Sequence, residues 1–105
     1  MNISNNKTGF TKVDHITFDL ILPTLSPSEQ SIFLRIYRQT VGWKKQSDKI
    51  SISQFKKFTG ILHNETIEFA IKRLENRTLI IVKKANGKTT EYEINWSYIL
   101  EMYSK

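Results

Sequence analysis

Residues 49–94, KISISQFKKFTGILHNETIEFAIKRLENRTLIIVKKANGKTTEYEI, decide the fold of this chain. They read in order as a short β-prone run, two segments with apolar residues at helical spacing, and two β-prone runs on either side of Asn86-Gly87. A strand, two helices joined by a tight turn and a hairpin form the plan of a winged helix-turn-helix. The sequence therefore predicts an α+β fold of three to four helices with a small three-stranded antiparallel sheet, in which the hairpin is the wing.

The first helix of the predicted pair begins after Ser51. Ser51 is a helix N-cap residue, and Gln54 three positions later completes a reciprocal capping pattern. The helix runs to about Thr59, and we expect Phe55 and Phe58 to face the core.

The second helix follows a turn at Gly60 and is capped by His63 or Asn64. Its buried stripe has helical spacing and consists of Ile67, Ala70, Ile71 and Leu74. At about 100° per residue, the opposite face holds Glu65, Phe69, Lys72 and Asn76, flanked by Glu68 and Arg73. The alternative is a helical phase shifted by one step, which places Phe69 at the edge of the core.

The hairpin supplies the partners of the first strand. Residues 79–84 are apolar and β-branched, and residues 89–94 place Tyr92 and Ile94 on one face. Asn86-Gly87 between them is typical of a type I′ turn. The strand predicted at residues 49–52 is too short to stand alone, so we expect it to pair with this hairpin.

Upstream of the predicted strand lies a well-marked helix. Ser26 is its N-cap, Pro27 occupies the first helical position, and Glu29 completes a capping box. The positions expected to face the core are Ile32, Phe33, Ile36, Tyr37 and Val41. We expect Gly42 to end this helix in the left-handed conformation.

Two shorter helices are predicted near the ends of the chain. Residues 15–22 place Ile16 and Leu20 on one side. Residues 96–103 have apolar side chains at helical spacing, namely Trp96, Ile99, Leu100 and Tyr103. This last helix packs either onto the domain or onto a second copy of the chain.

With 105 residues, the chain can bury roughly two-thirds of its unfolded surface around one core. We expect a flexible arm at residues 1–9 and a single winged-helix domain at residues 10–105. Cysteine is absent, which excludes disulfides and thiolate chemistry and fits a cytoplasmic location. No stretch has the length of a signal-peptide core or a membrane span, so we expect no export and no membrane contact.

Catalysis is not expected. The sequence has no glycine-rich phosphate loop, no nucleophile beside a base and no pair of carboxylates at catalytic spacing. His15 and His63 are too few for a metal cluster. We therefore expect neither an enzyme nor a cofactor.

The net charge of +6 favours a polyanionic partner, although a solubilising surface is the alternative interpretation. The positive charge concentrates upstream of the second helix of the pair. Residues 35–57 contain seven basic residues and one acidic residue, Asp48. The basic residues are Arg35, Arg38, Lys44, Lys45, Lys49, Lys56 and Lys57. Lys83, Lys84 and Lys88 flank the hairpin turn, where they can meet phosphates or protect the hairpin edge from pairing.

These observations predict a DNA interface, with duplex DNA favoured and single-stranded DNA as the alternative. The residues predicted to contact DNA are Lys44, Lys45, Gln54, Lys57, Asn64, Thr66, Lys72, Arg73, Lys83, Lys84 and Lys88. The phosphates of DNA repel carboxylates, so a glutamate is expected at a DNA interface only where it accepts a hydrogen bond from a cytosine amino group. Glu65, Glu68 and Phe69 therefore form an alternative surface on the second helix, which would bind a protein partner.

Six runs of the sequence resemble one family. They are FTKV (10–13), LILPTLSPSE (20–29), RQTVGWKK (38–45), DKISISQF (48–55), TGI (59–61) and AIKRLENRTLI (70–80). Over about residues 10–95 the chain resembles the N-terminal domain of bacteriophage replication protein O. The resemblance implies a winged-helix domain that binds repeated sites in a phage origin as a dimer, while a separate region recruits the host replicative helicase. The family usually carries Ser and Arg-like residues where this chain has Glu68 and Phe69, so base specificity is not transferred.

Three functions remain open from the sequence. A DNA-binding module could mark an origin during replication of a phage, plasmid or mobile element, or it could regulate transcription on the same scaffold. Binding sites clustered beside a replication gene favour the first, and an operator over a promoter favours the second. The third function is a protein-interaction module, whose partner is another replication protein or a second copy of the chain.

Overall fold

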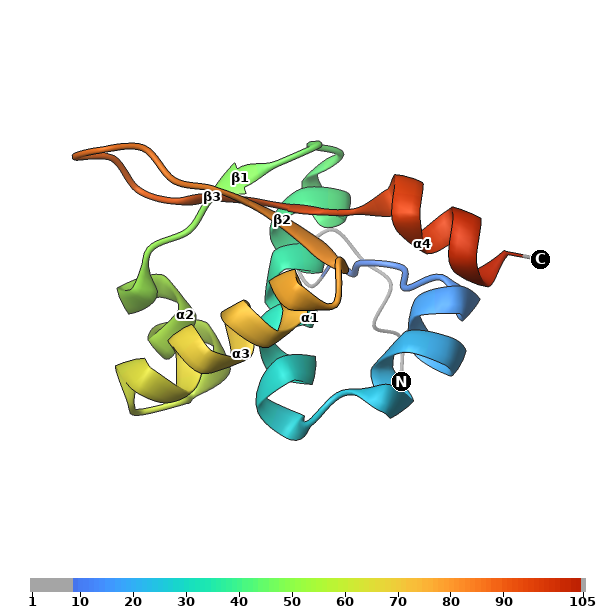
Figure 1. The fold of residues 1–105 in the computed structure, drawn as a ribbon, viewed down its shortest axis with the longest axis horizontal. Helices are drawn as coiled ribbons and strands as arrows, with labels where there is room; N and C mark the ends of the chain where they lie inside the picture. The colour runs from blue at the N-terminus through green and yellow to red at the C-terminus, as the bar shows by residue number, and fades with distance from the viewer. Residues whose placement is uncertain (1–8, 105) are drawn as a thin grey trace.

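The computed structural model describes residues 9–104 (Figure 1). The α-helices are α1 (Pro27–Thr40), α2 (Ile52–Thr59), α3 (Asn64–Asn76) and α4 (Trp96–Tyr103). The strands are β1 (Asp48–Lys49), β2 (Ile80–Lys83) and β3 (Glu91–Ile94). Short helical turns occupy Ile16–Ile21, Leu22–Thr24 and Val41–Trp43.

The order α1, β1, α2, α3 and the β2–β3 hairpin is that of a winged helix-turn-helix, so the predicted α+β fold is confirmed. The arm predicted at residues 1–9 lies outside the described residues except for Gly9. Within residues 9–104, no helix is long and apolar enough to cross a membrane.

Helix α1 lies in the middle of the domain and contacts α2, α3 and β3 (Figure 1). Its predicted capping box is present: the Ser26 hydroxyl accepts from the Glu29 N–H (3.2 Å), and the Glu29 carboxylate accepts from the Ser26 N–H (3.1 Å). The core side chains predicted on this helix are buried, namely Ile32, Phe33, Ile36 and Tyr37, and Val41 is half-buried.

The sheet has the antiparallel strand order β1-β3-β2. Asp48 of β1 lies opposite Tyr92, and Ile80 of β2 lies opposite Ile94. The prediction that the hairpin supplies the partners of the first strand is therefore confirmed. The Phe55 ring meets the Tyr92 ring edge-on, with 5.3 Å between centroids, and this contact packs α2 onto the sheet.

Two local predictions around the sheet are wrong. The strand predicted at residues 49–52 is limited to the two residues of β1, because Ser51 caps α2 and the helix starts directly after it. The wing turn is not type I′, which needs two residues with positive φ. Of the turn residues, only Gly87 (φ 70°) has one. The Lys88 N–H closes the turn by donating to the Ala85 carbonyl (3.1 Å).

The helix-turn-helix follows the prediction with one exception. Gly60 ends α2 in the left-handed conformation (φ 76°), and His63 is the N-cap of α3. The buried stripe of α3 is the predicted one, Ile67, Ala70, Ile71 and Leu74. Phe69 is 64% exposed, which excludes the shifted helical phase. Phe58 does not face the core: it is 46% exposed, and the Arg35 guanidinium lies over its ring at 4.3 Å from the centroid.

The helix predicted at residues 15–22 is a π-helix over Ile16–Ile21. A π-turn holds more residues than an α-turn, so the inward positions change: Thr17 is fully buried and Leu20 is 46% exposed. The Asp14 carboxylate holds this turn by accepting from the Thr17 N–H (2.9 Å) and hydroxyl (2.7 Å).

Helix α4 packs back onto the domain, which is one of the two predicted arrangements. The Asn95 side chain caps it by accepting from the Tyr98 N–H (3.3 Å). Ile99 is fully buried, and the Trp96 ring meets the Tyr37 ring edge-on at 5.9 Å between centroids. The last helix therefore belongs to the core of the domain.

The end of α1 differs from the prediction at Gly42. The short turn Val41–Trp43 extends the helix, so the left-handed residue is Lys44 (φ 54°). Gly42 is needed for space instead, because a Cβ there would lie 2.7 Å from the Thr11 hydroxyl oxygen. The segment before the first helix can therefore lie directly against the end of α1.

Helix α3 ends in a Schellman motif whose left-handed residue is Thr78 (φ 64°). The Leu79 N–H donates to the Leu74 carbonyl (3.1 Å), and the Thr78 N–H donates to the Glu75 carbonyl (2.9 Å). Glycine is usual at this position, and a β-branched residue with positive φ is strained.

We expect Thr78→Gly to raise the free energy of unfolding by about 0.5–1 kcal/mol, because glycine removes the left-handed strain at an exposed position. Urea unfolding followed by circular dichroism measures the change. The control is Thr89→Gly, an exposed threonine without positive φ, which should lower the stability by about 0.5 kcal/mol. Equal effects of the two substitutions would contradict the assignment of strain.

Candidate nucleic-acid interface

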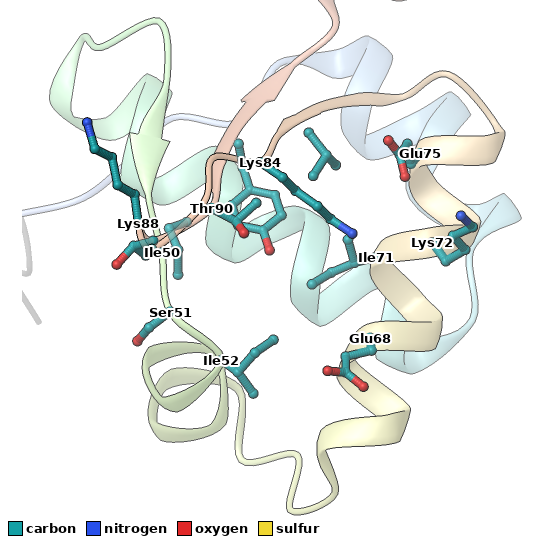
Figure 2. Close-up of a pocket in the computed structure, with 14 residues that line it drawn as sticks. Ile50, Ser51, Ile52, Glu68, Ile71, Lys72, Glu75, Lys84, Lys88 and Thr90 are labelled. Atoms are coloured by element: carbon teal, nitrogen blue, oxygen red, sulfur yellow. The ribbon is translucent and has the colours of Figure 1, made fainter.

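A hollow of about 690 Å³ lies between α3, the hairpin and the segment that leads from β1 into α2 (Figure 2). Its apolar lining comes from Ile50, Ile52, Ile71, Val82 and Tyr92. Its polar and charged lining comes from Ser51, Glu68, Lys72, Glu75, Lys84, Lys88, Thr89 and Thr90. This is the place where the helix-turn-helix and the wing face each other.

The charges around this hollow are mixed. Helix α3 contributes Glu68, Lys72 and Glu75, and the hairpin contributes Lys84 and Lys88. In Figure 2 the Glu68 carboxylate points into the hollow and Lys84 extends across it toward α3, whereas Lys88 points away from that helix. The hairpin side of the hollow is therefore positive, and the helix side carries two carboxylates.

Tyr92 lines the hollow and is 4% exposed. Burial raises the pKa of this phenol, and the negative charges of Glu75 and Glu68 raise it further, whereas a hydrogen bond with Thr90 lowers it in part. The pKa of the Tyr92 phenol therefore lies above its ordinary value.

Arg73, which the sequence predicts as a DNA contact, is half exposed and forms an ion pair with a buried carboxylate. Its guanidinium lies 2.5 Å from the carboxylate of Glu29, which is only 4% exposed. Burial alone would raise the pKa of Glu29, but hydrogen bonds from Ser26 and Arg73 outweigh it and lower the pKa. The pair joins the start of α1 to the last turn of α3, so Arg73 positions the helix.

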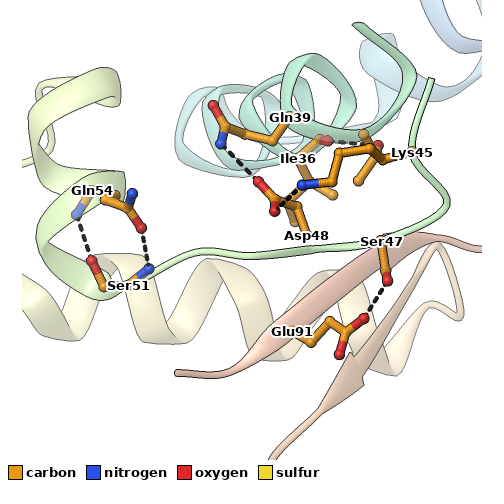
Figure 3. A network of polar contacts seen from close by, with 9 residues as sticks. Ile36, Gln39, Lys45, Ser47, Asp48, Ser51, Gln54 and Glu91 are labelled. Atoms are coloured by element: carbon orange, nitrogen blue, oxygen red, sulfur yellow. Dashed lines mark hydrogen bonds and ion pairs between the residues drawn. The ribbon is translucent and has the colours of Figure 1, made fainter. Parts of the chain in front are cut away.

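Gln54 and Lys45 are also held by local contacts (Figure 3). The Gln54 side chain accepts from the Ser51 N–H (2.8 Å) as the partner in the capping box of α2. Lys45 forms an ion pair with Asp48 (2.6 Å), whose carboxylate also accepts from Gln39 (3.0 Å). Both predicted contacts therefore serve first to fix the segment around β1.

The chain is matched by the family of bacteriophage replication protein O over residues 2–98. It belongs to this family. Membership assigns it a role in phage replication. Neither a curated protein nor a solved structure matches it.

In this replication protein O relative, the remaining predicted contacts are spread over the surface. Lys44 follows α1 and Lys57 lies on α2, and both are exposed. Asn64 starts α3, and Thr66 is half-buried on the same helix. Lys83 is paired with Glu93 across the hairpin (3.3 Å). Of the eleven predicted contacts, the hollow thus brings together Lys72, Lys84 and Lys88.

The three residues predicted as a partner surface are all exposed on α3. Glu68 lines the hollow beside the wing, whereas Phe69 lines a different hollow with Thr66 and Arg73. Glu65 is exposed on the first turn of α3. Their spacing of three and four residues places the three side chains on neighbouring positions of one exposed face of α3.

Two functional positions were not predicted from the sequence. Glu29 was predicted only as a helix cap, and nothing in a single sequence links it to Arg73, 44 positions away. Glu75 could have been found, because it lies seven residues after Glu68 and therefore on the same face of α3.

We expect Arg73→Ala to lower the free energy of unfolding by about 2 kcal/mol, since it leaves the buried Glu29 carboxylate without its cationic partner. Lys72→Ala, next to it and exposed, should stay within about 0.5 kcal/mol of the unaltered protein. Chemical denaturation measures both variants. A loss no larger for Arg73→Ala than for Lys72→Ala would show that the pair contributes little.

The lowered pKa of Glu29 predicts a pH dependence of stability. A carboxyl group whose pKa is lowered by folding stabilises the folded protein at pH values above the pKa that the group has in the unfolded chain, about 4.5 for Glu29. This contribution is lost as the pH falls through the pKa of the folded state. Glu29→Gln should therefore flatten the loss of stability below about pH 4.5, measured by urea titrations at several pH values. The exposed Glu65→Gln should keep the original profile. An unchanged profile for Glu29→Gln would exclude this carboxylate as a source.

Proposed function

We propose that the chain binds duplex DNA between α3 and the hairpin and acts in the initiation of phage replication. The observation that carries the proposal is the common hollow of α3 and the wing, with Lys72, Lys84 and Lys88 around it. In winged-helix proteins of this plan, one helix enters the major groove, and basic side chains contact the phosphate backbone. Membership in the replication protein O family supports an origin as the target.

The two sides of the hollow have different roles in DNA binding. The wing lysines attract phosphates and contribute affinity without sequence preference. Glu68, whose carboxylate points into the hollow, accepts a hydrogen bond from a cytosine amino group. Such an arrangement gives moderate affinity with selection for cytosine at one position, and it makes the chain a binding module rather than an enzyme.

Duplex binding by the intact chain should weaken with salt by a slope of about −0.9 in log–log form for each phosphate contact. We expect Lys84→Ala combined with Lys88→Ala to reduce that slope by up to about 1.8, because two contacts are removed. Fluorescence anisotropy of a labelled origin duplex at several salt concentrations measures it. Lys12→Ala, which removes one charge outside the hollow, is the control and should leave the slope unchanged.

An absence of duplex binding at low salt, or an equal reduction of the salt slope by Lys12→Ala, would overturn the proposal.

A second candidate function, binding of a protein partner, is favoured by the Phe69 ring, which is 64% exposed. If Phe69→Ala weakens self-association more than Lys72→Ala does and leaves duplex binding unchanged, the outward face of α3 is a protein interface.

A further inference from the structure

A second hollow, of about 280 Å³, lies at the end of α1 and is lined by two aromatic rings and an arginine. Its lining residues are Gly9, Phe10, Thr11, Arg38, Gly42 and Trp43. Phe10 is 69% exposed and Trp43 is 63% exposed, so neither ring is part of the core. The function proposed above does not use this hollow.

The fold orders the turn that carries Trp43 and places the segment of Phe10 beside it. Gly42 has no side chain, which lets Thr11 and its neighbour Phe10 lie against the end of α1. The Arg38 guanidinium lies 5.2 Å from the centroid of the Trp43 ring. Lys44 directly after Trp43 is the left-handed residue that ends the helix (φ 54°), a conformation that costs a non-glycine residue free energy. The Trp43 ring therefore stands on an ordered turn with a cation over it.

The charge around this hollow suits a polyanion. No carboxylate is present among the described residues that line it. Lys12 and Lys44 are the chain neighbours of lining residues, and both are exposed. The nearest acids in the sequence are held elsewhere: Asp14 accepts from Tyr37 and Thr17, and Asp48 is paired with Lys45.

Two other exposed phenylalanines of the chain also carry a nearby arginine, but their surroundings differ. Phe69 has Arg73 at 5.7 Å, yet its hollow also contains the Glu29 carboxylate. Phe58 has Arg35 at 4.3 Å, but its smaller hollow, about 200 Å³, contains a single ring. Of these three hollows, the one at Trp43 alone combines two rings and an arginine with no carboxylate.

We propose that the hollow formed by Phe10, Arg38 and Trp43 binds an unpaired base of single-stranded DNA. Aromatic side chains stack on any base, and adjacent cations follow the phosphates, which is how proteins hold single strands without sequence preference. The site is separate from the hollow between α3 and the wing. A domain that uses both surfaces could hold duplex DNA and a melted strand at the same time.

The test is anisotropy of a labelled oligothymidine with the intact chain at low salt. We expect Trp43→Ala to weaken binding by about fivefold or more, the loss usual for one stacked base, and Trp43→Phe to retain most of it. Phe69→Ala is the matched control, since it removes an equally exposed ring beside an arginine, and it should leave binding unchanged. An oligomer with abasic sites in place of thymine should bind weakly and equally to the unaltered chain and to Trp43→Ala.

Equal binding of oligothymidine by the unaltered chain and Trp43→Ala would overturn the proposal. If the unaltered chain does not bind oligothymidine at low salt, the proposal is overturned as well, and a protein segment becomes the alternative ligand of the hollow. Duplex binding is measured separately through Lys84 and Lys88, so the two proposals can fail independently. Circular dichroism of each variant confirms that the exposed substitutions leave the fold intact.

Discussion

The ion pair between the buried Glu29 carboxylate and the half-exposed Arg73 guanidinium is the contact on which the arrangement of the helix-turn-helix depends. Glu29 is 4% exposed and is hydrogen-bonded to both the Ser26 N–H and the Arg73 guanidinium. One carboxylate thus closes the start of α1 and fixes the last turn of α3. A buried charge is tolerated only when such partners are present, so the position of α3 relative to α1 is narrowly defined.

Because of such contacts, fewer basic side chains can bind a ligand than the sequence predicts. Arg73 and Lys45 are engaged in ion pairs, and Gln54 completes a helix cap. The positive side of the hollow beside α3 therefore comes from the hairpin, through Lys84 and Lys88, while the helix side carries Glu68 and Glu75. The wing is consequently the stronger source of attraction for phosphates, and the helix is suited to selecting a base rather than to attracting the duplex.

Most of the fold could be predicted from local signals. The capping residues Ser26 and Ser51, the turn glycine Gly60 and the buried stripe of α3 are where periodicity and cap chemistry place them, because these features act over a few residues. The errors have both local and distant origins. The Arg35 guanidinium over the ring of Phe58 comes from a segment distant in the sequence, whereas β1 is short because the neighbouring Ser51 caps α2.

The sequence by itself determined the winged helix-turn-helix, its basic character and its resemblance to replication protein O, since each rests on residue order and composition. Only the tertiary structure decided which charged side chains remain available. Arg73 and Glu29 lie 44 positions apart, and Phe10 and Trp43 line the same hollow although 32 other residues separate them in the sequence. Pairing and stacking require proximity in space, which a single sequence does not encode locally, and for this reason the candidate sites could be located only in the folded chain.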